Sequence, residues 1–489
     1  MLKKFFLALF VVFLVIASTL LERTLAFKSK QIKVQAVEQI PFGDSVIQRF
    51  AKALTFKTVS WEDSSKMDSS QFYAFHDFLK AGFPLMDSLL HRQYINKLSI
   101  LYKWQGSNSN LKPILLMAHQ DVVPVDTAKL NLWDEAPFAG KVSNGFVYGR
   151  GAQDVKCQLM ALHEAAEYLL KQGYQPERTI YFAFGHDEEI GGANGAKKVA
   201  EYLEKQGVKL EFLVDEGGAL LSDVVPGVKK PVAVIGTAEK GYVSFDLTVN
   251  QKGGHSSMPP KETAIGILSK AIAKLEDHPY PLRITGVSKQ MFDYVGPEMD
   301  FPMKMAMANR WLFKRLIVNQ LAKGNSSRAT LHTTTAATIF KAGTKENVLP
   351  STAMAVVNHR ILPGQTIDEL LQSDKEIIND DRLEIKQKGR FDANEASPIA
   401  DVNSESFRIM QKTIGQVMPD VIVAPFLEIG GTDSKHYLKI TDNVYRFQPI
   451  RMTGEDLERI HGNNERHELK NYKESINFFV RLIENATSR

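Results

Sequence analysis

Three short runs of bulky apolar residues, each followed by a polar break, constrain the first half of this chain most strongly. They cover residues 113–118, 179–184 and 211–214. Their length and composition are typical of strands buried on both faces of a sheet. Between them, apolar residues recur at helical spacing in 158–171 and 194–206. This alternation predicts an α/β fold with a mostly parallel sheet, in which ligands bind beyond the carboxyl ends of the strands.

The pattern changes near residue 241, where polar and apolar side chains begin to alternate. Such alternation is typical of antiparallel strands with one covered face. The alternating stretches lie within 243–249, 333–341 and 354–362, and helical spacing occurs at 261–275, 366–378 and 473–485. We therefore predict an α+β insert at 241–392 that interrupts a discontinuous catalytic domain made of residues 36–240 and 393–489.

The N-terminus carries targeting information. Lys3 and Lys4 precede an apolar run over 5–21, after which charged residues return. The run lies between the length of a signal-peptide core and that of a full membrane span. We expect residues 1–35 to act as an uncleaved signal anchor with the body exported to a periplasmic, lumenal or extracellular space. The alternative is a cleaved signal peptide and a secreted protein.

Composition excludes several classes of protein. The chain is 44% hydrophobic and 24% charged, which is incompatible with disorder. Its net charge of +4 is too small and too dispersed for a nucleic-acid binder, so we expect no nucleic-acid partner. Cys157 is the single cysteine, and it permits neither an internal disulfide nor a zinc site made of thiolates.

Acids and a histidine follow the predicted strands. His119 and Asp121 follow the first strand, and two residues apart on an extended chain they point to the same side. A glycine-rich loop places Asp154 before a helix. The remaining strands lead into Asp187-Glu188-Glu189 and Asp215-Glu216. Imidazole with several carboxylates suits zinc or a similar divalent ion, and a pair of ions requires a bridging carboxylate.

Five ordered motifs across about 100–480 resemble the metallopeptidase family that contains aminoacylase, carboxypeptidase S and acetylornithine deacetylase. Further segments are most similar to its branch with carboxypeptidase S and the N-fatty-acyl-amino-acid synthase/hydrolase. The five motifs are His119-x-Asp121, Gly149-Arg-Gly-Ala-Gln-Asp154, Asp187-Glu-Glu-x-Gly-Gly192, Asp215-Glu-Gly217 and Ile460-His-Gly-x-Asn-Glu465. The resemblance implies a di-zinc exopeptidase-like domain, with the insert serving as a lid and dimerisation domain.

The resemblance also implies the ligands of two zinc ions. Asp154 would bridge the ions, and His119 with either Asp215 or Glu216 would complete the first. Aminoacylase-type motifs align with Glu216, although Asp215 is an equally good oxygen donor.

The second ion would be held by Glu189 and His461, again by resemblance. Glu188 would be the general base, and Asp121 would hold the ring of His119. A carboxylate in this place can take a proton from a metal-bound water and pass it to a leaving nitrogen.

Lid and loop residues complete the site that the resemblance implies. His255 resembles the histidine that helps hold the transition-state oxyanion, often in the active site of a dimer partner. Asn347 and Arg360 match substrate-binding positions, and the planar fork of Arg360 suits a carboxylate. Gly431 and Thr432 resemble a backbone cradle beside the substrate. A homodimer formed through the lid is expected.

The expected reaction is hydrolysis of the amide bond of an N-acyl-amino acid, with a long acyl chain and reversibility both open. A carboxypeptidase S-like cleavage of the C-terminal peptide bond of short peptides is the alternative. A non-catalytic, membrane-anchored binding domain belongs to a different class, and it would have lost ligands or the base. All matched positions here hold chemically competent residues.

A methionine-rich segment lies between the lid helix and residue 333. Five of the 15 methionines fall between 291 and 307, and flexible thioethers suit surfaces that accept varied apolar partners. We expect the segment 288–315 either to line a site for a long acyl chain or to add core or dimer interface to the lid.

Overall fold

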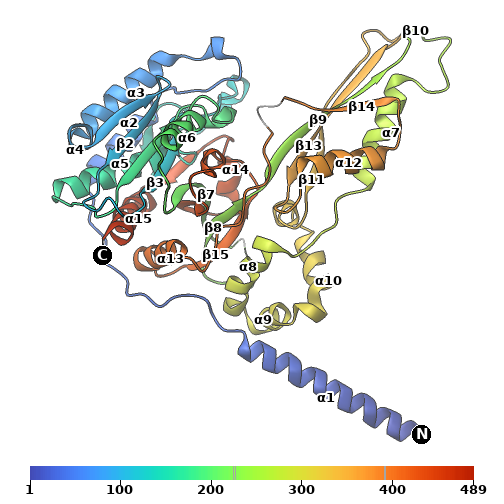
Figure 1. Ribbon diagram of the computed structural model, residues 1–489, viewed down its shortest axis with the longest axis horizontal. Helices are drawn as coiled ribbons and strands as arrows, with labels where there is room; N and C mark the ends of the chain where they lie inside the picture. The colour runs from blue at the N-terminus through green and yellow to red at the C-terminus, as the bar shows by residue number, and fades with distance from the viewer. Residues whose placement is uncertain (224, 226, 390–392, 489) are drawn as a thin grey trace.

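The computed structural model describes residues 1–223, 225, 227–389 and 393–488. A large body is built on an eight-stranded sheet, a smaller domain projects from it, and one helix extends from the N-terminus (Figure 1). That helix, α1 (Leu2–Ala26), includes the predicted apolar run, and its side chains are almost all exposed. Among the described residues it is the one helix long and apolar enough to cross a membrane.

The large sheet is mixed. Strands β6, β3, β7 and β16 are parallel neighbours at its centre, whereas β2 is antiparallel to β6, and β8 pairs antiparallel with β7 and β16. The predicted parallel sheet is confirmed at the centre, and the antiparallel strands lie towards the edges. The strands are β1 (His91–Ile95), β2 (Ser99–Trp104), β3 (Ile114–His119), β6 (Ile180–Gly185), β7 (Leu213–Leu221), β8 (Val232–Glu239), β15 (Ile422–Glu428) and β16 (Val444–Met452).

Helices cover both faces of this sheet. Successive residues of a strand point to opposite faces, so the central strands contribute apolar side chains to two cores. Leu116 and Phe182 face the larger core, while Leu115 and Tyr181 face a smaller one. The larger core is covered by α2 (Asp44–Ala53), α3 (Ser69–Gly82), α4 (Pro84–Leu89), α5 (Lys156–Lys171), α13 (Glu405–Val417) and α15 (Leu469–Thr487), and the smaller core by α6 (Ala196–Lys205) and η5 (Asp433–Tyr437). Both faces of the central strands are therefore buried, as their apolar runs predict.

Short elements surround the carboxyl ends of the central strands. The 3-10 turn η3 follows β6, and α14 follows β16. These elements are η1 (Ser64–Lys66), η2 (Thr127–Leu132), η3 (Glu188–Ile190) and α14 (Gly454–Arg459), with a three-stranded sheet of β4 (Lys141–Ser143), β5 (Phe146–Tyr148) and β17 (Arg466–Glu468).

The smaller domain is an antiparallel sheet with helices on one face, as predicted for the lid. Apolar side chains of its strands, such as Phe245 and Val357, pack against α7 and α12. A two-stranded ribbon, β10 with β12, lies at the end of this domain that is remote from the body (Figure 1). Its elements are β9 (Gly241–Asn250), β10 (Gly254–His255), α7 (Ala264–Asp277), β11 (Thr334–Ala342), β12 (Val348–Leu349), β13 (Thr352–Ile361), α12 (Ile367–Ile378) and β14 (Leu383–Gln387).

The chain passes from the large sheet to the lid sheet at Lys240, between β8 and β9. The predicted return at 392/393 falls on residues 390–392, which lie outside the described residues. The domain limits at 36–240, 241–392 and 393–489 stay a prediction.

The methionine-rich segment forms a helical extension of the large body. Helix α8 packs against β15, and Tyr294 and Met299 join the larger core of the catalytic domain. Among the described residues, none of 288–315 belongs to the core of the lid, so the segment does not extend that core. Its elements are α8 (Gly286–Val295), η4 (Gly296–Glu298), α9 (Phe301–Ala308), α10 (Arg310–Leu321) and α11 (Asn325–Ala329).

Candidate metal centre

His119 is the last residue of β3, and contacts with Asp121 orient its ring. The Nδ1 atom lies 2.9 Å from the backbone oxygen of Asp121 and 3.4 Å from that residue's Oδ1. The opposite nitrogen, Nε2, lies 3.0 Å from Asp154 Oδ1 and 3.4 Å from Glu216 Oε1. A hydrogen bond at one ring nitrogen leaves the other free for a metal ion, as is typical of histidine ligands.

Asp154 faces two histidines at once. Its Oδ1 faces His119, and its Oδ2 lies 3.0 Å from Nε2 of His461. His461 Nε2 is also 3.0 Å from Glu189 Oε2. One carboxylate that presents each oxygen to a separate imidazole has the arrangement needed to bridge two ions.

The loop that carries Asp154 is held by Glu465. Oε1 of this buried carboxylate accepts hydrogen bonds from the backbone N–H groups of Gln153 (2.6 Å) and Asp154 (3.1 Å). Oε2 accepts from the Gly151 N–H (3.0 Å) and from Nη1 of Arg150 (2.8 Å). Glu465 thus fixes the backbone at Asp154, and its presence in the last sequence motif was the available signal for it.

Asp121 also organises the turn after β6. Its carboxylate accepts the backbone N–H groups of Glu188 and Glu189, both at 3.1 Å. Its Oδ2 accepts a third hydrogen bond, 2.6 Å long, from Ser60 Oγ. The residue that orients His119 therefore also positions the backbone of the two adjacent glutamates. Ser60 has no motif around it, and sequence reasoning missed it.

A β-bulge determines which of the two adjacent carboxylates, Asp215 or Glu216, reaches the ligand cluster. The register of β16 against β7 slips between Asp215 and Gly218, and Gly217 has a φ of 125°, which favours glycine. Asp215 points behind the strand, where its carboxylate accepts the N–H groups of Glu216 (2.9 Å) and Ser434 (2.8 Å). Glu216 points to His119. The structure thus brings Glu216, rather than Asp215, to the ligand cluster.

The result is two groups of three ligand residues that share Asp154. In each group one ligand atom per residue lies within 4.8 Å of the others. The donors are imidazoles and carboxylates, which suit zinc and similar divalent ions. Oε1 of Glu189 is buried without a hydrogen-bond partner among the described residues, so an ion would satisfy an otherwise isolated oxygen. The groups are His119, Asp154 and Glu216, and Asp154, Glu189 and His461.

Without cations, the crowded carboxylates perturb one another's protonation. Burial, with Asp154 nearby, raises the pKa of Glu216 to about 8. Burial and the neighbouring Glu216 hold the pKa of Glu188 well above its ordinary value. Hydrogen bonds to Asp154 and Glu189 raise the pKa of His461 to about 10. The cluster thus retains protons at neutral pH that bound cations would displace.

Three of the predicted substrate residues meet where the lid joins the body. A Cβ atom on Gly431 would lie 4.0 Å from Nη1 of Arg360. Arg360 stacks over the ring of Tyr242, 4.8 Å from its centroid. Thr432 is buried and donates a 2.7 Å hydrogen bond to Glu239. Arg360 and Gly431 are therefore neighbours, and Thr432 is buried beside Gly431 in the loop whose Ser434 supports Asp215. We call Arg360, Gly431 and Thr432 the polar wall.

His255 and Asn347 lie elsewhere. Both are exposed on the terminal ribbon of the lid, where Ser256 N–H donates to the Asn347 carbonyl at 3.1 Å. Figure 1 shows this ribbon at the far end of the lid from the large sheet. Within one chain, the structure does not bring these two residues to the metal-ligand cluster.

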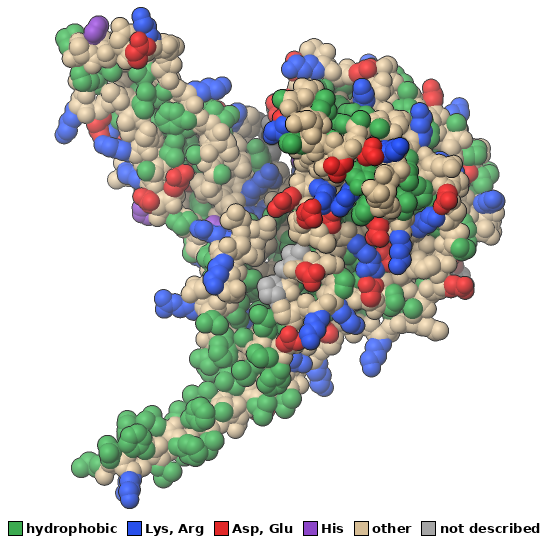
Figure 2. Space-filling view, turned by 180° about the vertical axis from the view of Figure 1, so that it is seen from behind, with side chains coloured by type: hydrophobic (Ala, Val, Ile, Leu, Met, Phe, Trp, Pro, Cys, Tyr) green, Lys and Arg blue, Asp and Glu red, His purple; other side chains and the backbone are tan. Residues whose placement is uncertain are grey.

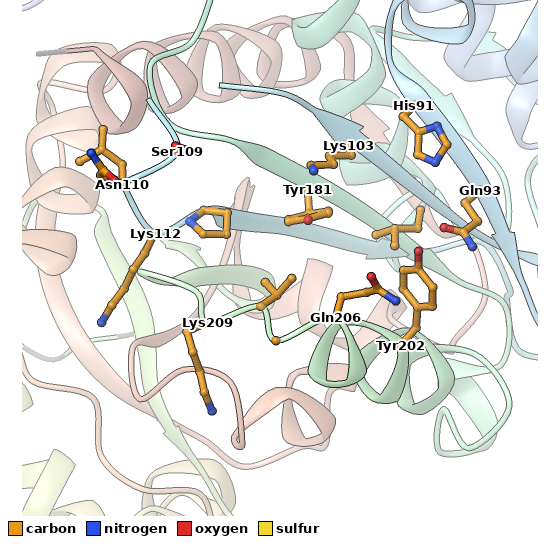
Figure 3. Close-up of a pocket in the computed structure, with 15 residues that line it drawn as sticks. His91, Gln93, Lys103, Ser109, Asn110, Lys112, Tyr181, Tyr202, Gln206 and Lys209 are labelled. Atoms are coloured by element: carbon orange, nitrogen blue, oxygen red, sulfur yellow. The ribbon is translucent and has the colours of Figure 1, made fainter. Parts of the chain in front are cut away.

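A separate surface cavity of about 580 Å³ is lined by Tyr181, Tyr202 and three lysines (Figure 3). Its wall includes Pro113 and Lys209, which precede β3 and β7. It therefore lies at the amino ends of these strands, opposite to the ligand cluster, and is not part of the candidate active site.

Paired ligand groups joined by one carboxylate, with a further glutamate beside them, define the class of dinuclear metallohydrolases. The sequence matches the profile of Peptidase family M20/M25/M40 over residues 115–485. The chain belongs to this family.

Two relatives extend over nearly the whole chain. It is 41% identical to Probable carboxypeptidase S-like 2 of Dictyostelium discoideum over 474 residues, which is 95% of this chain and 90% of that protein. It is 41% identical to the N-fatty-acyl-amino acid synthase/hydrolase PM20D1 of Xenopus tropicalis over 444 residues, or 90% and 86% of the two chains. The predicted family and its branch are therefore confirmed.

Solved structures share the fold. An M20 family metallo-carboxypeptidase from Sulfolobus solfataricus superposes with a TM-score of 0.66 at 20% identity, covering 90% of this chain and 99% of that one. A dinuclear metal-binding M20 peptidase from Bacillus subtilis gives 0.56 at 14% identity, with 90% and 97% covered. The predicted α/β fold of a metallopeptidase is confirmed.

Proposed function

We propose that this chain is a di-zinc amidohydrolase that cleaves the amide bond of N-acyl-amino acids. One observation carries the proposal: the two oxygens of Asp154 each lie 3.0 Å from a different histidine, and each histidine approaches a second carboxylate. His119 and Glu216 would hold one ion, and Glu189 and His461 the other. Bound zinc would supply Lewis acidity and a water of lowered pKa.

Glu188 acts as the general base in this proposal. Its backbone N–H is tied to Asp121, which places its carboxylate beside the ligand groups. The nearby cations would keep the Glu188 carboxylate ionised. It can then accept a proton from the attacking water and later donate it to the leaving nitrogen. Asp121 serves as a positioning residue, because it also orients the ring of His119.

The polar wall of Arg360, Gly431 and Thr432 would receive the carboxylate next to the scissile amide. A guanidinium fork binds a carboxylate with two parallel hydrogen bonds. This group is shared by an N-acyl-amino acid and by the C-terminus of a peptide. C-terminal peptide cleavage is thus the second candidate, favoured by the carboxypeptidase S-like relative. Turnover of a long-chain acyl-amino acid and of an N-blocked dipeptide by the purified chain would rank the two.

We further propose that the chain works as a homodimer joined through the lid. His255 and Asn347 are exposed at the lid tip, where a second copy can approach them. His255→Ala and Glu188→Gln chains should each be inactive alone. Refolded together, they should recover about a quarter of wild-type activity, since half of the dimers would contain one intact site. No recovery would contradict a shared site.

The N-terminal helix completes the proposal as a membrane anchor with the body exported. It is 25 residues long and contains an 18-residue stretch with a mean hydropathy of 2.5, and basic residues precede its apolar run. An N-terminal sequence starting within residues 20–35 in the mature protein would instead establish a cleaved signal peptide.

The catalytic proposal is tested by Glu188→Gln. Loss of general-base catalysis predicts a fall in kcat of roughly 10²- to 10⁴-fold. Two zinc ions per chain should remain, because Glu188 is not a proposed ligand. Glu204→Gln, an exposed change on α6, is the control. Unchanged turnover in Glu188→Gln, or a chain that binds no metal, would refute the assignment.

A further inference from the structure

Helices α9 and α10 leave an unusual amount of apolar surface exposed. Helix α9 buries no side chain, and α10 buries only Ile317. A helix that covers a protein core normally buries an apolar stripe. Here five large apolar side chains, which we call the α9–α10 face, are instead exposed. They are Phe301 (54%), Met303 (37%), Trp311 (57%), Leu312 (48%) and Leu316 (68%).

This face adjoins the N-terminal helix. α1 packs against α9, and the fully buried Asn309 donates from Nδ2 to the Leu20 carbonyl (3.1 Å) and to Thr24 Oγ1 (3.3 Å). Phe27 lies so close to Gly296 that a Cβ there would be 2.6 Å from the ring. The last turns of α1 are therefore fixed to the body, and Figure 2 shows hydrophobic side chains continuing from α1 onto it.

The charge of this segment is one-sided. From Phe301 to Leu321 the sequence holds four basic residues and no acidic one. Lys314 and Arg315 are exposed on α10, beside Trp311 and Leu316. Exposed apolar side chains, an aromatic ring and basic residues together are typical of segments that lie in the headgroup layer of a membrane.

We propose that the α9–α10 face docks into the surface of the lipid bilayer that holds α1. The inference rests on the proposed role of α1 as a membrane anchor and is independent of the catalytic proposal. Because Leu20, Thr24 and Phe27 connect α1 to this helical extension, the membrane surface must lie next to α9 and α10 when α1 is inserted. The body then has two adjacent attachments, which fix the orientation of the catalytic domain relative to the membrane.

Trp311 offers a direct test in the full-length protein. α1 contains no tryptophan, and Trp104 and Trp133 are buried in the body. The half-buried Trp61 is present in both wild type and Trp311→Phe, so the comparison cancels its contribution. The chain is reconstituted into vesicles of phosphatidylserine and phosphatidylcholine brominated along its acyl chains. Docking predicts that bromine quenches a component of the emission that is missing from Trp311→Phe. Insertion through α1 alone predicts flotation with the vesicles and no such quenching.

Two further variants sharpen the result. Phe340 is 46% exposed on the lid strand β11, so Phe340→Trp in a Trp311→Phe background should remain unquenched. Lys314→Glu with Arg315→Glu should shift the docking equilibrium away from the lipid by at least about five-fold per charge. Hydrolysis of a short acyl-amino acid, measured in parallel, reports catalysis separately.

The possible results divide clearly. Quenching specific to Trp311 that the charge reversals weaken supports bilayer docking. Flotation without quenching overturns it, and so does a failure of the chain to float. A blue shift of Trp311 emission without bromine quenching would assign the face to a second copy of the chain and would likewise overturn the proposal.

Discussion

Glu465→Gln perturbs the proposed bridging ligand without changing any ligand atom. The native carboxylate accepts four hydrogen bonds, two at each oxygen. Whichever way the amide is placed, its NH₂ group faces two N–H donors. Two charge-assisted hydrogen bonds are lost, and each contributes about 1.5–3 kcal/mol, so the native loop loses about 3–6 kcal/mol of stabilisation. Glu465 is fully buried, and water cannot replace these partners.

The expected consequence is weaker metal binding. The loop carries Asp154, and its displacement acts on both ligand groups at once. Loss of such a supporting residue typically costs 10- to 100-fold in metal affinity, which we expect for Glu465→Gln. The same variant should regain much of its turnover when free zinc is raised, because no group proposed to react has been removed.

Metal affinity by chelator competition and turnover against free zinc are the assays. Glu468→Gln is the control, since Glu468 is exposed three residues further along the chain. Glu465→Asp keeps the charge on a shorter side chain, and its zinc affinity should lie between those of Glu465→Gln and Glu468→Gln. Wild-type zinc affinity in folded Glu465→Gln would refute the argument that the carboxylate holds Asp154 in place.

Three further results are expected. Zinc binding at pH 7 should release about two protons or more, because the pKa values of His461 (about 10) and Glu216 (about 8) are raised without metal; a calorimetric enthalpy independent of the buffer would contradict this. Burial, with Arg360 nearby, lowers the pKa of Lys240 to about 7 from 10.5. The unfolded chain then binds more protons between pH 7 and 10.5, so the stability of wild type relative to Lys240→Met should rise by about 1.4 kcal/mol per pH unit, measured by chemical denaturation. A pH-independent difference would show that Lys240 stays charged. Arg360→Lys should raise KM about 10-fold with little change in kcat, while Arg382→Lys should not; an unchanged KM would exclude Arg360 from carboxylate binding.

Much of the fold was predictable because local patterns coincide with the tertiary arrangement. The runs at 113–118 and 179–184 became β3 and β6, and the helical spacing at 158–171 became α5. The antiparallel pairing of β8 with β7 and β16 was not predictable, because apolar runs do not encode strand direction. The position of the helical extension was not predictable either, since its composition does not indicate which sheet it covers.

The candidate site likewise has features that the sequence predicted and features that only the structure shows. The resemblance of the sequence motifs to the metallopeptidase family named the residues that the structure gathers into two ligand groups. Those that follow parallel strands come together because the carboxyl ends of neighbouring strands meet at one edge of a sheet. Only the tertiary structure brought Glu216 rather than Asp215 to His119, since a bulge at Gly217 turns the chain between them. The tertiary structure also shows that Arg360 and Gly431 lie far from the lid tip.

The sequence by itself thus determined the family, the order of strands and helices along the chain, and the chemical types gathered at one end of the sheet. The family follows from the resemblance of five short motifs, the order of elements from periodicity, and the chemical types from residue chemistry, all of which are local properties. The tertiary structure alone decided which carboxylate oxygens face which imidazole nitrogens, that Glu465 holds the Asp154 loop, and that α9 lies against α1. Such contacts join segments up to 315 residues apart, and no local pattern records them.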